Sequence, residues 1–184
     1  MRVAVIEPAM PVLSLLEVKD HLAVDSDDSD ALIASYTASA IAHIDGPEGW
    51  LGRSIGVQTL EARCDVFRDA MQLSYGPVID IVSVEYVSPA GQPLVVSPAD
   101  YELRGWILGS SFGRRWPTVG KHPEAVRIRY RVGYEEVPPA IRAAILLMVG
   151  DLYRNRDTVT TGSAASTPMS TTVANLLGPF RVWR

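Results

Sequence analysis

The chain has 184 residues, 47% of them apolar, which is enough to bury a core of its own and excludes disorder throughout. A formal net charge of −4 excludes general affinity for nucleic acid, which needs a dense cationic surface, but leaves room for a local basic patch. A single cysteine, Cys64, excludes an internal disulfide and a cysteine-only zinc site.

The apolar run before Glu7 and Pro8 is too short for a signal peptide, and no stretch reaches the ~20 apolar residues of a membrane span, so we expect synthesis in the cytoplasm and no membrane partner.

Two helices are predicted near the N-terminus. The first helix covers 14–22, with Ser14 and Glu17 spaced as a capping box. The second covers 28–45 and ends before Pro47. Acidic side chains of the run 25–30 are expected to cap it.

The middle of the chain, 57–134, changes to the two-residue period of β-strands. Apolar and polar residues alternate from Thr59 to Val66, where Cys64 is expected on the buried face. Further strands are predicted at 78–87 and in the short runs 94–96, 101–103 and 106–108. The clearest strand is 126–132, with arginines on alternate positions.

A third helix is predicted over 139–154, because Pro138 and Pro139 fit a first turn and apolar residues follow at helical spacing. Leu146 and Leu147 lie off its main stripe, so the helix is apolar on most sides. Such a helix is central to a core or shared with another subunit, and these two leucines are candidates for a subunit interface.

The C-terminal segment is predicted to be a flexible tail, since half of the residues in 158–175 are Ser or Thr and show no periodicity. Its end is different, with Gly178-Pro179 expected to keep it extended. Apolar and aromatic residues there form a candidate anchor for a portal or a neighbouring subunit: Leu176, Leu177, Phe180 and Trp183. The alternative is that this terminus folds back on its own domain.

The sequence contains no constellation of catalytic or metal-binding residues. The run 25–30 lacks the glycine and glutamate of an EF-hand loop, since those positions hold Asp30 and Tyr36. The three histidines have no ligand spacing, and the glycines at 105, 109 and 113 match no phosphate-binding loop. We therefore expect no enzyme activity, no cofactor and no metal.

Basic residues offer one binding hypothesis. The loop 114–122 holds Arg114, Arg115 and Lys121, and the strand after it places Arg127, Arg129 and Arg131 on one face. Together they are candidates for a surface that touches DNA phosphates. The alternative is a solvated sheet face whose arginines pair with nearby acids, which the acidic total charge favours.

Motifs along residues 13–157 resemble the phage head–tail connector family, which includes relatives in gene transfer agents. They are the strand and Gly-Tyr of 126–134, the Val-Pro and Ala-Ile helix of 137–145, the Tyr-x-x-Arg of 151–156, the opening helix 15–22, and the block 76–86. The order of the predicted elements (helices, a β block, a helix and a tail) itself predicts an α+β fold: a bundle of three main helices with an inserted antiparallel β block and an extended C-terminal tail.

The resemblance also implies a function. Such a protein forms a ring of twelve copies beneath the portal, contacts a tail-side connector or stopper protein, and lets DNA pass without sequence specificity at the head–tail junction of a virion or phage-like particle. The connector domain then covers 1–157 and the tail 158–184. Two other hypotheses stay open: a small nucleic-acid-binding module using the basic loop and arginine face, and, with least support, a small enzyme.

Overall fold

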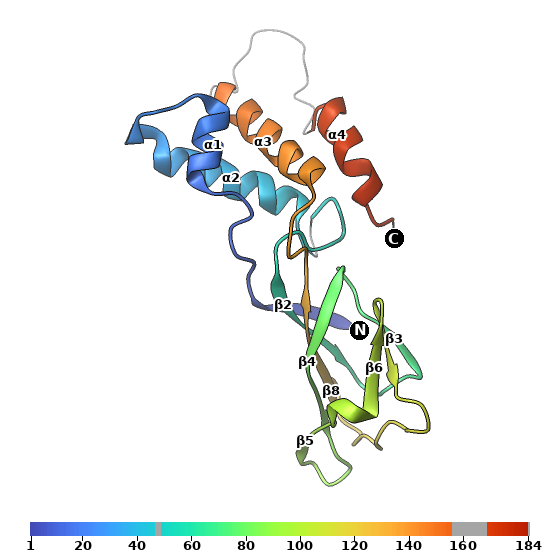
Figure 1. The fold of residues 1–184 in the computed structure, drawn as a ribbon. Helices are drawn as coiled ribbons and strands as arrows, with labels where there is room; N and C mark the ends of the chain where they lie inside the picture. The colour runs from blue at the N-terminus through green and yellow to red at the C-terminus, as the bar shows by residue number, and fades with distance from the viewer. Residues whose placement is uncertain (47–48, 156–168, 184) are drawn as a thin grey trace. The chain divides into compact units, whose positions relative to one another are not determined.

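The computed structural model describes residues 1–46, 49–155 and 169–183. It confirms the α+β class, with helices and antiparallel sheets (Figure 1). The chain divides into two compact units, which we call the sheet unit (Met1–Met10 and Arg53–Glu135) and the helical unit (Pro11–Gly52 and Glu136–Arg184). The described C-terminal residues, 169–183, fall within the helical unit.

The helical unit is organised around α3, which contacts α1, α2 and α4. The predicted ranges 14–22, 28–45 and 139–154 correspond to the first three helices, with a short 3₁₀ turn, η1, before the second. The elements of this unit are α1 (Leu15–Leu22), η1 (Asp27–Ser29), α2 (Asp30–Ile44), α3 (Pro139–Arg154), α4 (Thr171–Leu177) and η3 (Gly178–Phe180). Packing against three helices explains why α3 is apolar on most of its surface.

Local contacts at the start of α1 correct half of the predicted capping box. Ser14 Oγ accepts a hydrogen bond from the backbone N–H of Glu17 at 3.2 Å, as expected. The Glu17 carboxylate does not return to Ser14 but binds Arg142 of α3, with Nη2–Oε distances of 2.5 and 2.6 Å. A charge-assisted contact between two helices has replaced a local cap.

The sheet unit contains two antiparallel sheets rather than one block. A five-stranded sheet has the order β1-β2-β8-β4-β5, and a three-stranded sheet has the order β3-β7-β6. Their bounds are β1 (Arg2–Glu7), β2 (Gln58–Cys64), β3 (Ala70–Gln72), β4 (Val78–Val87), β5 (Pro93–Val95), β6 (Tyr101–Arg104), β7 (Ile107–Ser110) and β8 (Val126–Val132); the turn η2 (Pro98–Asp100) precedes β6.

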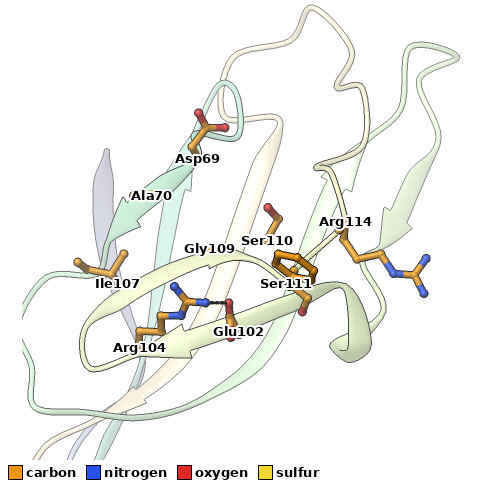
Figure 2. A pocket seen from close by; sticks show the side chains of 11 residues that line it. Asp69, Ala70, Glu102, Arg104, Ile107, Gly109, Ser110, Ser111 and Arg114 are labelled. Atoms are coloured by element: carbon orange, nitrogen blue, oxygen red, sulfur yellow. Dashed lines mark hydrogen bonds and ion pairs between the residues drawn. The ribbon is translucent and has the colours of Figure 1, made fainter.

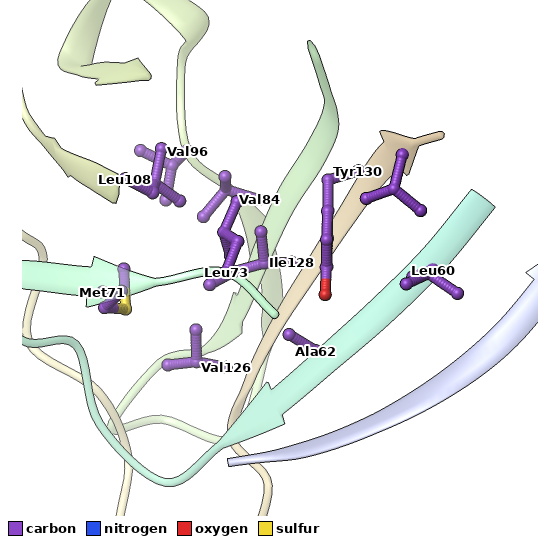
Figure 3. Packing of buried hydrophobic residues seen from close by; sticks show 11 residues of the cluster. Leu60, Ala62, Met71, Leu73, Val84, Val96, Leu108, Val126, Ile128 and Tyr130 are labelled. Carbon is purple, nitrogen blue, oxygen red and sulfur yellow. The ribbon is translucent and has the colours of Figure 1, made fainter. Parts of the chain in front are cut away.

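The core of the sheet unit collects apolar side chains from both sheets (Figure 3). The central strand β8 contributes every second residue, namely Val126, Ile128, Tyr130 and Val132, all buried. The Tyr130 hydroxyl donates to the backbone oxygen of Ser74 at 3.1 Å. Burial raises the pKa of this phenol far above its ordinary value, so it stays neutral and serves packing.

Two strand assignments differ from the sequence prediction. The N-terminal residues 2–7 form β1, which pairs antiparallel with β2 although it lies outside the predicted β block. At its other end β2 stops at Cys64 instead of continuing to Val66, which is exposed. Cys64 is accordingly only half-buried, because the strand ends before the core fully covers it.

The C-terminal prediction is corrected in its described part. Residues 171–177 form α4, and Gly178–Phe180 form a 3₁₀ turn, where an extended chain was expected. Ser170 caps α4 by accepting from the backbone N–H of Val173 at 3.3 Å. Val173 and Leu177, four residues apart on one helix face, are fully buried. The rest of the predicted flexible segment, 158–168, lies outside the described residues.

Candidate interaction surfaces

The arginine face of β8 is largely neutralised by acids on neighbouring strands. Arg129 Nε donates to Glu61 Oε2 at 2.8 Å, and Arg131 forms a bidentate contact with Asp80, with an Nε–Oδ1 distance of 2.8 Å. Hydrogen bonds from Arg131 lower the pKa of the Asp80 carboxyl despite its partial burial. Two of the three β8 arginines that were predicted to face DNA therefore already have carboxylate partners, as in the alternative that the acidic composition favoured.

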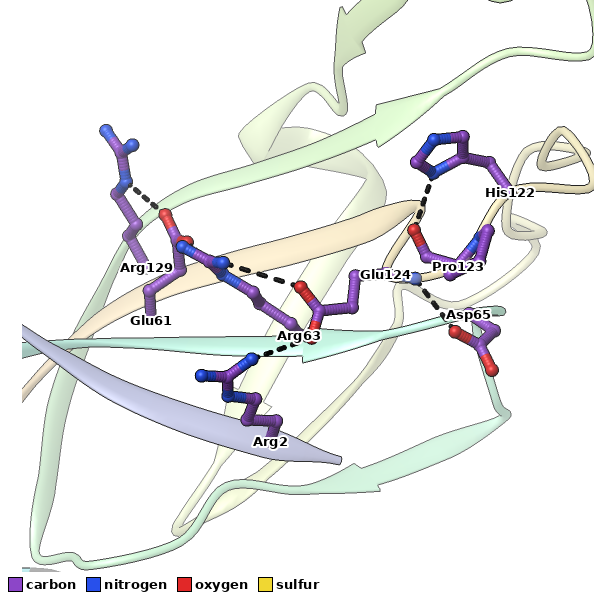
Figure 4. A network of polar contacts seen from close by, with 8 residues as sticks. All are labelled: Arg2, Glu61, Arg63, Asp65, His122, Pro123, Glu124 and Arg129. Carbon is purple, nitrogen blue, oxygen red and sulfur yellow. Dashed lines mark hydrogen bonds and ion pairs between the residues drawn. The ribbon is translucent and has the colours of Figure 1, made fainter.

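Glu61 of β2 lies at the centre of this polar network (Figure 4). The sequence did not single it out, because the alternation of apolar and polar residues in this strand predicts that Glu61 faces solvent. It is only 1% exposed, and Arg63 Nε donates to its other oxygen at 2.7 Å. Burial raises the pKa of Glu61, but hydrogen bonds from Arg129 and Arg63 outweigh it, so the pKa lies below its ordinary value. The network continues to Glu124, whose carboxylate lies 3.4 Å from Arg63 Nη1.

Arg127 differs from the other two arginines of its strand. It is exposed and lies between Arg63 and Glu85 in the register of the sheet. Within the part of the chain that the structure describes, it has no ion pair. The arginine face thus presents one uncompensated charge where the sequence suggested three.

The predicted basic loop 114–122 lies within the connection between β7 and β8, residues 111–125, and from here on basic loop means this whole connection. It is held against the rest of the sheet unit at several points. The Trp116 ring stacks on Phe67 with centroids 4.5 Å apart. Gly120 donates from its backbone N–H to Val87 O at 2.8 Å, and a Cβ at this glycine would lie 2.5 Å from Ser88 O, so no larger residue fits. The backbone N–H of Glu124 donates to Asp65 Oδ1 at 2.8 Å. The loop is therefore preformed.

The outward side chains of this loop border a shallow cavity of about 360 Å³ (Figure 2). Arg114, at its rim, pairs with Asp100 across 3.3 Å, whereas Arg115 and Lys121 are exposed and have no acidic partner among the described residues. Phe112 is completely exposed. The cavity also contains the Arg104–Glu102 pair, so its charges are mixed and balanced. The exposed loop side chains, not the cavity, carry the uncompensated charge.

The candidate interface residues of α3 are half-buried. Leu146 and Leu147 lie between the buried residues Ile145 and Met148, in a helix that already contacts α1, α2 and α4. Packing within the helical unit therefore accounts for part of their apolar surface. The remainder of their surface is exposed to solvent.

The four candidate anchor residues do not share one environment. Leu177 is 0% exposed inside the helical unit, Leu176 and Phe180 are half-buried, and Trp183 is 75% exposed. The segment after α4 is held by the backbone N–H of Val182, which donates to Leu51 O at 2.9 Å. The terminus thus folds back on its own unit.

Arg181 completes this attachment. Its guanidinium carbon lies 4.1 Å from the ring centroid of Trp50 and 4.0 Å from that of Trp183, a double cation–π contact. The sequence did not reveal this contact, because Trp50 and Arg181 are far apart along the chain.

The acidic run 25–30 does not cap α2 as predicted, since neither Ser26 nor Ser29 makes a side-chain cap. Instead Lys19 Nζ binds Asp27 Oδ1 at 2.7 Å and Asp30 Oδ1 at 2.8 Å. Hydrogen bonds to these two aspartates raise the pKa of Lys19 to about 12. Asp25 and Asp28 stay exposed without a cation among the described residues.

Other candidate reactive residues are dispersed. His21 and His43 are exposed near the ends of their helices, and His122 is an exposed loop residue. Over residues 1–46, 49–155 and 169–183, no group of three potential ligands is placed to hold a metal ion. Burial raises the pKa of the Cys64 thiol, which makes it a weak nucleophile. No helix in the described ranges is long and apolar enough to cross a membrane.

Comparison with solved structures shows the fold over the full length of the chain. A chain in the neck of an empty gene transfer agent (GTA) particle, computed with C6 symmetry, matches with a TM-score of 0.77 and 22% identity. A chain in the virion of the native GTA particle matches with a TM-score of 0.75 and 24% identity. A chain in the native GTA neck, computed with C12 symmetry, matches with a TM-score of 0.75 and 22% identity.

Each match covers 100% of this chain and 97% of the other. No protein-family description matches the sequence, and no curated protein matches it significantly. The chain therefore has the fold of these GTA-particle chains.

Proposed function

We propose that this chain is a structural head–tail adaptor, a neck protein that joins the head of a phage or gene transfer agent particle to its tail. The observation that carries the proposal is the full-length fold match, with TM-scores of 0.75 to 0.77, to chains of GTA particles, two of them in the neck. The order of sequence motifs along residues 13–157, which resembles the connector family, supports the same assignment.

The adaptor forms a closed ring of twelve copies around the DNA path. The rotational symmetry of the similar necks supports a ring, and the C12 symmetry of one of them supports the number twelve. The charge of the chain suits a conduit: each copy carries −4, and Arg129 and Arg131 already have carboxylate partners. DNA passing through such a ring is repelled by the overall field and is not gripped by a cationic surface.

The ring binds the portal on its head side and a connector or stopper protein on its tail side. The accessible C-terminal residues, Trp183 with parts of Phe180 and Leu176, are the proposed portal contact. Leu177 is left out of this surface, because it is fully buried in its own unit. Tryptophan is among the residue types that contribute most to binding energy at interfaces.

The direct test mixes the purified full-length chain with the portal protein of the same particle and counts bound copies by native mass spectrometry. We expect the chain alone to be monomeric or weakly associated, because identical copies repel, and to form a twelve-copy ring on the portal. Trp183→Ala should weaken portal binding. Leu16→Ala, which also shortens an exposed apolar side chain of the helical unit, is the matched control and should not.

A second test of the adaptor proposal removes the protein from the particle. Deletion of the gene should give filled heads that lack tails. A chain that does not bind the portal, and whose deletion leaves complete particles, contradicts the adaptor proposal. A salt-dependent gel shift by the free chain would instead favour the nucleic-acid-binding alternative, since phosphate contacts weaken steeply with salt.

A further inference from the structure

Three exposed side chains of the basic loop have no role in the adaptor function as stated. Phe112 is completely exposed, and Arg115 and Lys121 have no acidic partner among the described residues. The Trp116–Phe67 stack and the tight turn at Gly120 hold the loop in place. A preformed loop loses little conformational entropy when a partner binds, so this arrangement suits a binding surface.

The chemistry of this surface favours a protein partner over DNA. Aromatic residues and arginine are enriched at protein interfaces, and an exposed phenylalanine contributes nothing to contacts with backbone phosphates. Of the three arginines on the adjoining strand β8, Arg129 and Arg131 are already paired with Glu61 and Asp80. Only Arg127 adds a free charge to the loop, and one more cation does not make a track of the length that DNA needs. The partner that fits presents exposed carboxylates.

The same chain carries such carboxylates in its helical unit. Lys19 holds Asp27 and Asp30, which fixes the turn before α2. Asp25 and Asp28 of that turn stay exposed, and the described residues place no cation beside them. Neither the basic loop nor the acidic turn is self-complementary, but each is complementary to the other.

A ring with rotational symmetry can bring these two complementary surfaces together at each junction between copies. In a closed ring every copy uses two different surfaces, one toward each neighbour. We infer that the basic loop of one copy, through Arg115 and Lys121, docks on the acidic turn, Asp25 and Asp28, of the next copy around the ring. This inference rests on the proposed ring and names the surfaces by which its neighbours recognise each other.

The test exchanges the charges on the full-length chain. A loop variant carries Arg115→Glu and Lys121→Glu, and a turn variant carries Asp25→Lys and Asp28→Lys. A control variant, Arg68→Glu with Arg127→Glu, reverses two other exposed arginines of the sheet unit. Ring formation on purified portal is measured by native mass spectrometry over a range of protein and salt concentrations, after thermal melting has shown that each variant folds.

Each variant alone should fail to close the ring, raising the protein concentration for half-assembly on the order of a hundredfold, because every junction then faces like charges. The equimolar mixture should restore the ring with the two variants alternating, since an acidic loop then meets a basic turn and a basic loop meets an acidic turn. The control should assemble like the unmodified chain.

The outcomes separate the two proposals. If the unmodified chain forms no ring on the portal, the adaptor proposal fails and this inference fails with it. If the unmodified chain and both variants form rings equally well, the adaptor proposal stands and the inference is wrong. A mixture that fails to assemble, when each variant alone also fails, overturns the direct pairing of loop and turn.

Discussion

Replacing Leu177 with alanine tests whether the C-terminal segment is part of the folded chain before any partner binds. The seven residues of α4 are too few to be stable as an isolated helix, so they depend on the burial of Val173 and Leu177. Leu177 is 0% exposed, and truncation of a fully buried leucine to alanine costs about 2–5 kcal/mol. We expect the lower part of that range, about 2–3 kcal/mol, because the end of a short helix relaxes more easily than a central one.

A loss of that size should lower the melting temperature by about 4–12 °C in a chain of this length. Calorimetry on the full-length protein measures the shift. Hydrogen exchange of the backbone amides in α4 assigns it to the helical unit, to which this helix belongs. The matched control is Leu176→Ala, one residue earlier and only half-buried, for which we expect about 1 kcal/mol or less. Equal, negligible shifts for both variants would refute the docking of α4 and return the segment to the status of a free anchor.

Three further predictions follow from single contacts. Glu61→Gln should lower the free energy of unfolding at neutral pH and make that free energy depend less on pH in the acidic range, as measured by unfolding at a series of pH values. The reason is that the pKa of Glu61 is depressed in the folded state, so its carboxylate stabilises the protein above the ordinary glutamate pKa and loses this effect as the pH falls through the folded-state pKa. Trp116→Ala should speed hydrogen exchange in residues 111–122 without unfolding the sheet unit, because the stack on Phe67 holds the loop; unchanged exchange would show that the backbone contacts suffice. Arg181→Ala should release the C-terminal residues, seen as altered tryptophan fluorescence and faster C-terminal proteolysis, since the contacts to both rings are lost.

Elements with a strong local signal were predictable from the sequence. The strands β4 and β8 and the helix α3 have the predicted bounds, because alternation or helical spacing agrees there with the packing that the fold imposes. Strand β1 was missed, since residues 2–7 are ordered by pairing with β2 and have no strong pattern of their own. Helix α4 was missed because Ser- and Thr-rich composition outweighed the one available signal, the four-residue spacing of Val173 and Leu177.

The interaction surfaces were less predictable, for a physical reason. Which arginine keeps a free charge depends on carboxylates that are distant in sequence: Arg129 is separated from Glu61, and Arg131 from Asp80, by more than fifty residues. A sequence shows that acids are abundant but not which ones the sheet register brings opposite each cation. The same holds for Arg181, whose partner Trp50 precedes it by most of the chain.

The order of strands also determines when the protein can fold during synthesis. The middle of the large sheet, β8, is its last strand to be translated, and β2 and β4 contact each other only through it. The chain also passes between the two units three times, so each unit is built from separate stretches of sequence. Contacts of such high sequence separation form late and slowly. A nascent or prematurely terminated chain that ends before Val126 therefore exposes two unpaired strand edges, and we expect the cell to present it to chaperones and proteases rather than to an assembling particle.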